Sequence, residues 1–328
     1  MILNILFIII GLVILVIGAE GLVRGASSIA AKFNISPLVI GLTVVSFGTS
    51  APELTVNLLA AADGSPDLAV GNIVGSNIGN ILLILGICAI IVPLKVKSST
   101  VWKEIPLALL GVVLLLVMGN DKFFDGVGFN SITRTDGITL LALMVIFMYY
   151  VFGLAKGDRA KSDKNSDVSE EGEEIKSYST PVSFLLTLAG LVALVVGGRL
   201  LVSGATDIAK AAGLSEALIG LTIVAIGTSL PELATSVVAA LKRQADIAIG
   251  NIVGSNIFNV FFVIGTTSSI LALPITSALT IDIFVAIGAT LLLLLFMFIG
   301  GRHKLVRWQG VVFLVLYAVY LVYLIARG

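Results

Sequence analysis

The chain has 328 residues, of which 58% are hydrophobic and 12% charged, and its mean hydropathy of +1.11 excludes a soluble globular protein and indicates a polytopic membrane protein. The formal net charge is zero and the basic residues form no stripe, so a nucleic-acid partner is not expected. With one cysteine (Cys88) and one histidine (His303), the chain can assemble neither an intramolecular disulfide nor an ordinary zinc or copper site.

Ten apolar stretches are long enough to span a bilayer, which takes about 20 residues. No lysine or arginine precedes the first of them, so we interpret it as a spanning helix and not as a cleaved signal peptide. The predicted spans lie near 3–24, 37–62, 69–93, 104–119, 135–155, 181–203, 216–241, 248–273, 279–300 and 308–326. The sequence therefore predicts an all-α membrane protein with ten transmembrane helices in two sets of five.

The two sets are copies of each other. The heptapeptide GTSAPEL, which contains Glu53, recurs as GTSLPEL with Glu232, and AVGNIVGSNIGN recurs as AIGNIVGSNIFN. The offset is 179 residues (232 − 53), and it also relates Asn80 to Asn259 (259 − 80). Because five is an odd number, the second copy must cross the membrane in the opposite sense, which gives inverted repeats. Both glutamates are then expected near the membrane midplane.

The polar segment between the halves predicts the domain organisation. Residues 156–180 are polar and mixed in charge, which is typical of a flexible linker. A small regulatory calcium sensor is the alternative, although the acids of this segment are not spaced as a recognisable binding loop. We expect residues 1–155 to form the first five-helix repeat and residues 181–328 the second.

The basic residues predict the orientation in the membrane. Of the 20 lysines and arginines, 15 fall in loops on the side reached after the first helix, and five fall on the opposite side. The five are Lys122, Arg134, Arg199, Lys210 and Arg327. Since basic loops stay in the cytoplasm, this asymmetry predicts a multi-pass protein of the cell membrane with both termini outside and the 156–180 loop inside.

The duplicated glutamates predict a functional site. A carboxylate at membrane depth costs several kcal/mol unless it is compensated, so Glu53 and Glu232 indicate function. Residues four apart share a helix face, which adds neutral oxygen and amide groups beside each acid. In the first half these candidates are Ser46, Thr49, Ser50, Asn72, Ser76 and Asn80, and in the second half Ala225, Thr228, Ser229, Asn251, Ser255 and Asn259.

Pro52 and Pro231 predict backbone ligands at the same place. A proline inside a helix has no N–H for the carbonyl four residues earlier, and its ring crowds that carbonyl. The oxygens near Gly48 and Thr49, and their counterparts in the second half, are therefore expected to leave the helical ladder. In a membrane such broken backbone persists only where it lines a cavity or meets an ion.

This ligand set suits a hard cation. Calcium takes about six to eight oxygens at roughly 2.3 to 2.6 Å from carboxylates, amides and carbonyls. Two carboxylates neutralise one divalent ion, and sodium has a similar size and the same preference for oxygen. One pocket could therefore hold calcium and sodium by turns, with both ions bound as substrates and no cofactor.

The paired motifs, their spacing to GSNI and the five-plus-five layout resemble the calcium/cation antiporter superfamily, most closely its prokaryotic sodium/calcium exchangers. The resemblance implies that Glu53 and Glu232 coordinate calcium together with the backbone oxygens of Thr49 and Thr228. It implies sodium sites that add Ser76, Ser255 and the backbone oxygens of Ser46 and Ala225, while Asn80 and Asn259 face the central site.

One residue distinguishes this chain within the superfamily. Some relatives, including archaeal and potassium-dependent exchangers, have aspartate where this chain has Asn259. Vertebrate-type potassium-independent exchangers resemble this chain in having asparagine there. The asparagine argues against potassium cotransport and limits the formal charge of the site to two. Proton/calcium exchangers of the superfamily usually carry a GNATE-like motif in place of GTSxPE, so proton coupling is the alternative to sodium coupling.

The resemblance also implies a transport mechanism, in which the first and sixth helices slide across the rest. Their glycines are expected to permit this close sliding; they are Gly11, Gly18, Gly25, Gly190, Gly197 and Gly204. Outside the site, Glu20 aligns with Arg199 and is expected at the membrane interface, and Asp282 is expected to cap its helix or lie at the interface.

Two other function classes are weighed against antiport. An intramembrane serine protease needs a histidine beside its serine, and the sole histidine, His303, lies in a predicted cytoplasmic loop. A passive cation channel uses the same oxygen ligands and stays open as an alternative, although inverted halves that meet at one buried site favour a transporter. The sequence leaves the oligomeric state open.

Overall fold

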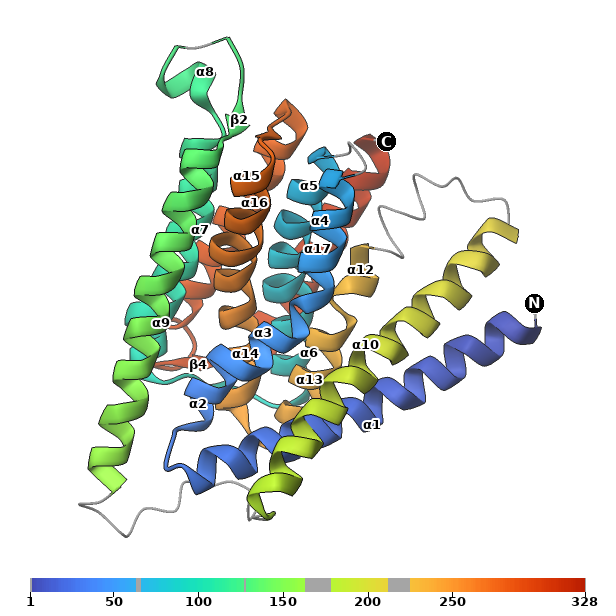
Figure 1. Ribbon diagram of the computed structural model, residues 1–328, viewed down its shortest axis with the longest axis vertical. Helices are drawn as coiled ribbons and strands as arrows, with labels where there is room; N and C mark the ends of the chain where they lie inside the picture. Colours follow the sequence, from blue (N-terminus) through green and yellow to red (C-terminus); the bar gives the residue numbers. More distant parts are fainter. Residues whose placement is uncertain (1, 63–65, 127, 163–177, 212–224, 328) are drawn as a thin grey trace.

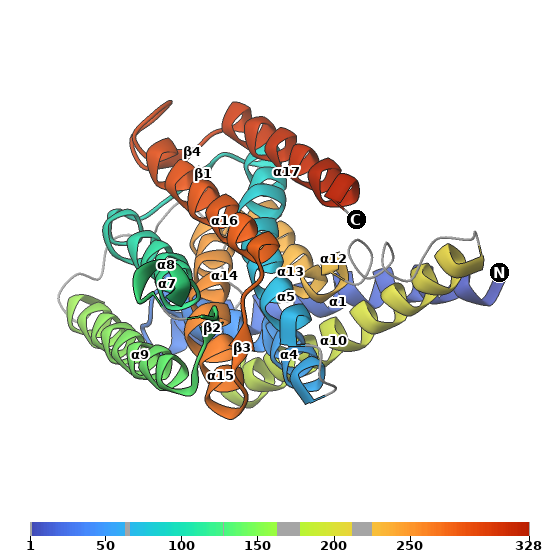
Figure 2. The same cartoon turned by 90° about the horizontal axis from the view of Figure 1, so that it is seen from above.

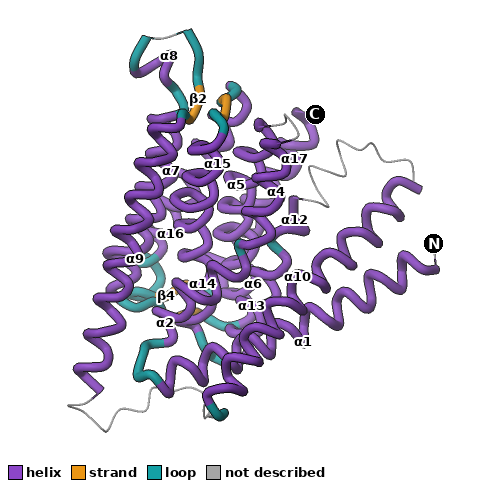
Figure 3. Tube along the Cα trace, in the orientation of Figure 1, coloured by secondary structure: helices purple, strands orange, loops and turns teal. Residues whose placement is uncertain are grey.

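The computed structural model describes residues 2–62, 66–126, 128–162, 178–211 and 225–327, and these are almost entirely helical (Figure 3). The first half consists of α1 (Ile2–Lys32), α2 (Pro37–Ile40), η1 (Gly41–Val45), α3 (Ser46–Thr49), α4 (Ala51–Ala62), α5 (Pro66–Gly79), η2 (Asn80–Leu85), α6 (Gly86–Ile91), β1 (Leu94–Lys95), η3 (Thr100–Glu104), α7 (Ile105–Met118), α8 (Asp121–Phe124), β2 (Ser131–Ile132) and α9 (Arg134–Ser162). The second half consists of α10 (Thr180–Ala211), α12 (Ala225–Thr228), α13 (Leu230–Leu241), α14 (Ala245–Phe258), η5 (Asn259–Ile264), α15 (Gly265–Ile270), β3 (Leu273–Pro274), α16 (Ser277–Phe296), β4 (Lys304–Leu305) and α17 (Arg307–Arg327).

The predicted spans are confirmed wherever the structure describes them. Within the described ranges, nine helices are long and apolar enough to cross a membrane, and each overlaps one predicted span. The remaining predicted span, 216–241, is described only from residue 225 onward, as α12 and α13. A helix is the natural form of such a segment because it satisfies its own backbone polar groups, which no water reaches inside a bilayer.

Burial separates a central group of helices from an outer ring. In Ala245–Ile270, 94% of the most apolar window is buried, and in Ala69–Ile91 78% is buried. The corresponding share is 22% for α1, for α17 and for the described part of α9 up to Gly157. Seen from above, α14 and α5 lie within the bundle, and α9, α16 and α17 lie around it (Figure 2). The third helix of each half is therefore the core of the protein. It carries a row of polar residues, which we call the polar stripe: Asn72, Ser76 and Asn80 in the first half, and Asn251, Ser255 and Asn259 in the second.

Helices α1 and α10 stand apart from this bundle. They lie side by side with opposite chain directions and extend away from the other helices toward the N-terminus (Figures 1 and 2). Their lower ends pack against the bundle, chiefly α1 against α13. The first helix of one half thus has its main partner in the first helix of the other half.

Two short antiparallel ribbons show the inverted relation of the halves. Each ribbon pairs a strand of one half with a strand of the other, with the registers Leu94↔Leu305 and Lys95↔Lys304, and Ser131↔Pro274 and Ile132↔Leu273. Strands β1 and β3 follow equivalent helices at the repeat offset (273 − 94 = 179). The ribbon of β2 lies at one end of the bundle and that of β4 toward the other (Figure 1). Equivalent ribbons at opposite ends are the expected result of two copies with opposite orientation.

Helix α9 continues past the predicted span, which ends at residue 155, through Ser162, and α10 begins at Thr180. The division into residues 1–155, 156–180 and 181–328 stays a prediction. The apolar pattern located the span but not the extra helical turns, because a helix that leaves the bilayer can continue with polar residues. The prediction of a flexible linker concerns residues 163–177, which lie outside the described residues.

Among the described residues, four π-helical turns lie in the spans, and two of them are repeat counterparts. The turns η2 and η5 begin at Asn80 and Asn259 and end at Leu85 and Ile264, each pair separated by 179 residues. A π turn widens the helix and frees backbone groups from the regular ladder, and such turns are frequent at functional sites. The helix backbone therefore changes where the polar stripe ends.

The two isolated acids outside the site are ion-paired. Asp282 does not cap α16, whose N-cap is Thr276, but accepts two hydrogen bonds of 3.0 Å from the guanidinium of Arg327. This bidentate pair joins the start of α16 to the end of α17. Glu20, which is 41% exposed, pairs with Arg24 on its own helix and with Lys242 at 3.1 Å. Lys242 ends α13, so this pair joins α1 to the bundle.

Candidate functional site

The helix that carries GTSAPEL and the helix that carries GTSLPEL, which we call the signature helices, both break between the threonine and the proline of this motif. Helix α3 ends at Thr49 and α4 begins at Ala51, while Ser50 has φ −83° and ψ 2°. Helix α12 ends at Thr228 and α13 begins at Leu230, while Ser229 has φ −87° and ψ 5°. The predicted break is confirmed in both halves. It arises because a proline two residues further cannot donate to the preceding turn.

The two glutamates are buried at these breaks. The exposed fraction is 1% for Glu53 and 0% for Glu232, and the two carboxylates lie close enough to interact electrostatically. Each carboxylate also interacts with the threonine of the opposite half: Glu53 with Thr228, and Glu232 with Thr49. The GTSAPEL and GTSLPEL motifs of the inverted repeat therefore lie in contact with each other.

Hydrogen bonds from the threonines reach the polar stripe of the opposite half. Thr49 donates to Asn251 Oδ1 at 3.0 Å, and its counterpart Thr228 donates to Asn72 Oδ1 at 3.3 Å. Neither threonine therefore acts only on its own preceding turn. Asn251 in turn donates to the backbone oxygen of Glu232 at 3.4 Å, which holds the stripe against the broken helix.

The serines are less symmetric than the threonines. Ser50 donates to Glu232 Oε1 at 3.3 Å, whereas its counterpart Ser229 donates to Ser76 Oγ at 3.3 Å. Ser255, the counterpart of Ser76, is fully buried and its hydroxyl oxygen has no hydrogen-bond partner among the described residues. The two halves thus hold equivalent serines in different arrangements.

The remaining predicted residues lie on the helices that carry the rest of the candidate site. Asn80 and Asn259 are each 1% exposed and open the π turns η2 and η5. Ser46 is fully buried at the start of α3, and its hydroxyl oxygen lies where a side chain on Gly254 would be. Ala225 opens α12, so its backbone begins the short helix that leads to the break.

Sequence reasoning missed two groups of residues here. Asn77 and Asn256 are each 2% exposed and hydrogen-bond to the opposite half, although both stand inside the duplicated GSNI segment and obey the 179-residue offset (256 − 77). That offset was the signal that could have found them. Asn57 and Ser236 accept hydrogen bonds from Asn72 and Asn251. They occupy equivalent positions in the two halves, but because one is asparagine and the other serine, the repeat did not reveal them.

Five buried oxygens of the predicted site have no hydrogen-bond partner among the described residues. They are Glu53 Oε2, Glu232 Oε2, Asn80 Oδ1, Asn259 Oδ1 and Ser255 Oγ. A buried polar atom without a partner costs about 1–3 kcal/mol, and more when it is charged. All five can accept, and two belong to carboxylates, so a cation is one group that would satisfy all of them. Hard cations such as Ca2+ and Na+ take ligands of this kind.

The charge of the set is limited to these two acids. Within the described ranges, no group of three or more acidic, histidine or cysteine residues gathers. The other candidate ligands are neutral amides, hydroxyls and carbonyls. Such a set does not suit a zinc or copper ion, which takes nitrogen and sulfur ligands.

A model of the sodium/calcium exchanger protein family matches residues 3–153 and 182–326, which is most of both halves. The chain belongs to this family. It is therefore a multi-pass membrane transporter of the calcium/cation antiporter superfamily, and the resemblance found in the sequence is confirmed.

Individual relatives and solved structures agree with this assignment. The chain is 31% identical to the sodium/calcium exchanger MaX1 of Methanosarcina acetivorans over 347 residues, covering 98% of each chain. It is 42% identical to the inner membrane protein YrbG of Escherichia coli (strain K12) over 258 residues, covering 79% of this chain and 77% of YrbG. The fold is similar to that of the sodium-calcium exchanger NCX_Mj, with a TM-score of 0.81, 34% identity and 98% coverage of each chain.

The glycines of α1 and α10 contact each other, whereas they were expected from the sequence to face the other helices. Gly11 and Gly18 face Gly197 and Gly190, so that a side chain on Gly11 would lie 2.7 Å from the oxygen of Gly197, and one on Gly190 2.7 Å from the oxygen of Gly18. We call this contact line between α1 and α10 the glycine seam. These glycines therefore do not face the bundle across which the helices were expected to slide. Instead they join α1 and α10 into one unit.

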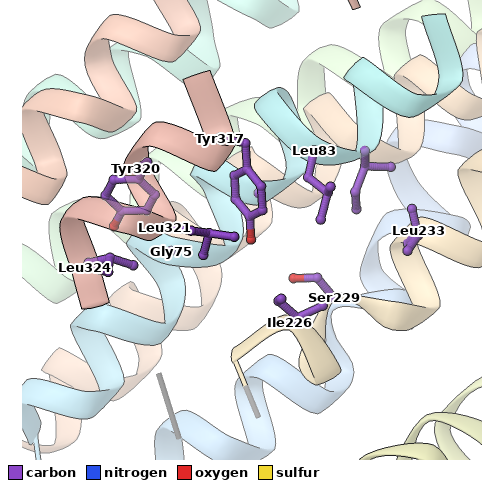
Figure 4. A pocket seen from close by; sticks show the side chains of 11 residues that line it. Gly75, Leu83, Ile226, Ser229, Leu233, Tyr317, Tyr320, Leu321 and Leu324 are labelled. Carbon is purple, nitrogen blue, oxygen red and sulfur yellow. The ribbon is translucent and has the colours of Figure 1, made fainter. Parts of the chain in front are cut away.

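An apolar pocket of the exchanger reaches the edge of the site. It has a volume of about 40 Å3 and lies between the α5–η2 helix, the α12–α13 break and α17 (Figure 4). The hydroxyls of Ser229 and Tyr317 face this space, and Gly75 forms part of its wall (Figure 4). A water needs roughly 10–15 Å3, so the pocket can hold a small hydrated group beside Ser229.

Proposed function

We propose that this antiporter exchanges Ca2+ for Na+ by alternating access to one midplane site built around Glu53 and Glu232. The observation that carries the proposal is the set of five buried acceptor oxygens without partners, two of them from these carboxylates. A dication neutralises the pair, and several monovalent cations can do the same. The family of the chain and its likeness to sodium/calcium exchangers support calcium as the divalent substrate.

The proposed ligands divide between the two ions. Calcium binds both carboxylates and the backbone oxygens of Thr49 and Thr228, which stand at the helix breaks. Sodium ions use these groups together with neutral oxygens around them, and the unpartnered hydroxyl of Ser255 supports this role. The neutral set consists of Ser46, Ser50, Ser76, Asn80, Ala225, Ser229, Ser255 and Asn259, with Ser46 and Ala225 acting through their backbone oxygens.

Coupled exchange, and not uncoupled leakage of calcium, follows from the free-energy cost of burying two uncompensated carboxylates. A carboxylate closed off in a low-dielectric interior costs several kcal/mol even after the protein relaxes. The site can therefore be occluded only when calcium, sodium ions or protons compensate Glu53 and Glu232. A cation must return for each calcium that leaves, which is the condition for coupled antiport.

Sodium dependence is the result expected from transport measurements. Purified protein in liposomes loaded with sodium should take up calcium-45, and liposomes loaded with choline should not. A pH gradient without sodium should drive little uptake, because the motif is GTSxPE in both halves. Uptake driven by the pH gradient alone would establish the alternative, a proton/calcium antiporter. Calcium flux in the choline control would instead indicate a channel.

The orientation and the domain division are part of the proposal. The C-terminal ends of α1 and α9 lie at the same end of the bundle as β4, and α8 lies at the opposite end (Figure 1). The first group carries the lysine-rich connections, so we place it in the cytoplasm and both termini outside the cell membrane. The inverted repeats, residues 1–155 and 181–328, are then the two structural units.

The contacts of α10 with the two signature helices supply a test of alternating access. A side chain on Gly48 would lie 2.4 Å from Leu191, whereas one on its counterpart Gly227 would lie 2.2 Å from Val202. The contact of Gly48 with Leu191 has an equivalent in which each residue is replaced by its repeat counterpart, and that equivalent is a contact of Gly227 with Leu12. We propose that this exchanged contact belongs to the opposite access state.

Cysteine pairs test that exchange of contacts. In a Cys88→Ala background, a Gly48→Cys/Leu191→Cys pair should cross-link in the described state. A Gly227→Cys/Leu12→Cys pair should cross-link in the other state, and each disulfide should stop calcium uptake until it is reduced. The second pair is decisive. If it fails to form at every sodium and calcium concentration while the first pair forms, the proposed exchange of contacts is wrong.

A further inference from the structure

Two buried asparagines lie beside the candidate ligands without belonging to them. Asn77 and Asn256 each stand three residues before a candidate ligand, Asn80 or Asn259, and so share its helix face. All four side chains are at least 98% buried, since their exposed fractions are 1–2%. Nothing in the proposed exchange of ions uses Asn77 or Asn256.

Reciprocal hydrogen bonds join these four residues across the two halves. Asn80 Nδ2 donates to Asn256 Oδ1 at 2.9 Å, and Asn259 Nδ2 donates to Asn77 Oδ1 at 3.0 Å. Asn77 Nδ2 donates to the backbone oxygen of Asn256 at 3.3 Å, and Asn256 Nδ2 returns the same bond to the backbone oxygen of Asn77 at 3.3 Å. The arrangement maps onto itself when the halves are exchanged.

These bonds fix which end of each candidate ligand amide faces the site. An asparagine amide has an acceptor oxygen on one side and a donor NH2 on the other. Because the NH2 groups of Asn80 and Asn259 are used by the opposite half, their oxygens are the atoms left without a partner. A cation needs the oxygen, and the reversed amide would present hydrogens to it.

The unpartnered oxygens argue against a purely structural network. A buried polar network that serves stability alone is most favourable when every member is satisfied, since each orphaned acceptor costs about 1–3 kcal/mol. This network satisfies both polar ends of Asn77 and of Asn256 but only the donor ends of Asn80 and Asn259. It holds two acceptors ready for a ligand from outside the protein.

We propose that Asn77 and Asn256 are positioning residues for cation binding, each holding the ligand amide of the opposite half with its oxygen toward the cation. This inference rests on the proposed function, because it assigns Asn80 and Asn259 as ligands of the transported ions. It also explains why the neutral residue at 259 suits this chain. An aspartate there would set an acceptor oxygen against Asn77 Oδ1, so Asn77 favours an amide at that position.

Double-mutant cycles on calcium affinity test the proposal. Asn77→Ala removes the acceptor for Asn259 but keeps the backbone oxygen that Asn256 uses. Asn77→Ala and Asn259→Ala should each raise the KM for calcium about tenfold, equivalent to about 1.4 kcal/mol, with the maximal rate within about threefold of wild type. The double variant should be no worse than Asn259→Ala, because Asn77 acts through that amide.

The chain offers a matched control for this cycle. Asn77 makes no hydrogen bond to the Asn80 side chain and meets it only through Asn256, so the effects of Asn77→Ala and Asn80→Ala should come closer to multiplying than those of Asn77→Ala and Asn259→Ala. The mirror cycle, Asn256→Ala with Asn80→Ala, should again be non-additive. Multiplying effects in both same-ligand cycles would overturn the proposal, since independent structural damage gives that result.

Volume-matched variants guard against loss of folding. Asn77→Thr is neutral, nearly keeps the volume and offers a hydroxyl acceptor to Asn259, so it should raise the KM for calcium less than Asn77→Ala does. Asn77→Leu has no acceptor and should raise it as Asn77→Ala does. Equal effects of Thr and Leu would also overturn the proposal. Absence of sodium-driven uptake in the wild type would remove the proposed function itself, which makes the two failures distinguishable.

Discussion

Glu53→Gln or Glu232→Gln is expected to abolish sodium-driven calcium uptake. Glutamine keeps the volume of the side chain and one oxygen but removes half of the negative charge of the site. Removing one charge from a compensated buried set costs about 3–5 kcal/mol, which corresponds to at least a hundredfold loss of affinity. Calcium-45 uptake into sodium-loaded liposomes, compared with wild type at several calcium concentrations, measures the effect. Retained exchange in either variant would exclude that carboxylate as a ligand.

A third buried glutamate supplies the control. Glu104 has an exposed fraction of 0%, like Glu232, but it lies in η3 and accepts a hydrogen bond from Tyr150 on α9. Glu104→Gln therefore removes a buried carboxylate outside the site. Its uptake should stay within a few-fold of wild type, whereas equal loss in Glu104→Gln would show that burial alone makes these acids sensitive.

Gly197→Ala is expected to disrupt transport through packing instead of ion binding. Its new methyl group would lie 2.7 Å from both the backbone oxygen of Gly11 and the backbone nitrogen of Leu15. Neither atom can turn aside as the end of a side chain can, so α1 and α10 must move apart. Overpacking of this kind costs about 1–3 kcal/mol, and the glycine seam extends that displacement along both helices. We expect a lower melting temperature in detergent and a loss of most uptake.

The neighbouring residue is the matched control. A side chain on Gly198 would meet no atom within 4 Å, although Gly198 is also buried in the same helix. Gly198→Ala should therefore keep both the melting temperature and the uptake close to wild type. If the two variants behave alike, the seam is not what holds α1 and α10 together.

Much of the fold was predictable because the chain repeats itself. The 179-residue offset paired Glu53 with Glu232, and the odd number of helices gave the inverted arrangement that the ribbons display. Length and hydropathy placed every described span. The extra length of α9 escaped because hydropathy reports where a helix lies in the bilayer and not where it ends in water.

The contacts within the site were not predictable from the same offset. The offset relates equivalent residues, but hydrogen bonds join non-equivalent ones, such as Thr49 with Asn251 and Asn77 with Asn259. Those pairings depend on how the halves dock, which the repeat alone does not give. The packing partner of the glycines was not predictable for the same reason. Their spacing indicates a helix face that packs closely, but it does not show which helix packs against that face.

The glycine seam has a consequence for the energetics of the transport cycle. Exchanging the halves converts the contact of Gly11 with Gly197 into that of Gly190 with Gly18, so the seam is its own counterpart. A helix pair with this symmetry can offer equivalent surfaces to the bundle from either end. The seam itself then contributes little to a free-energy difference between the two access states that we propose.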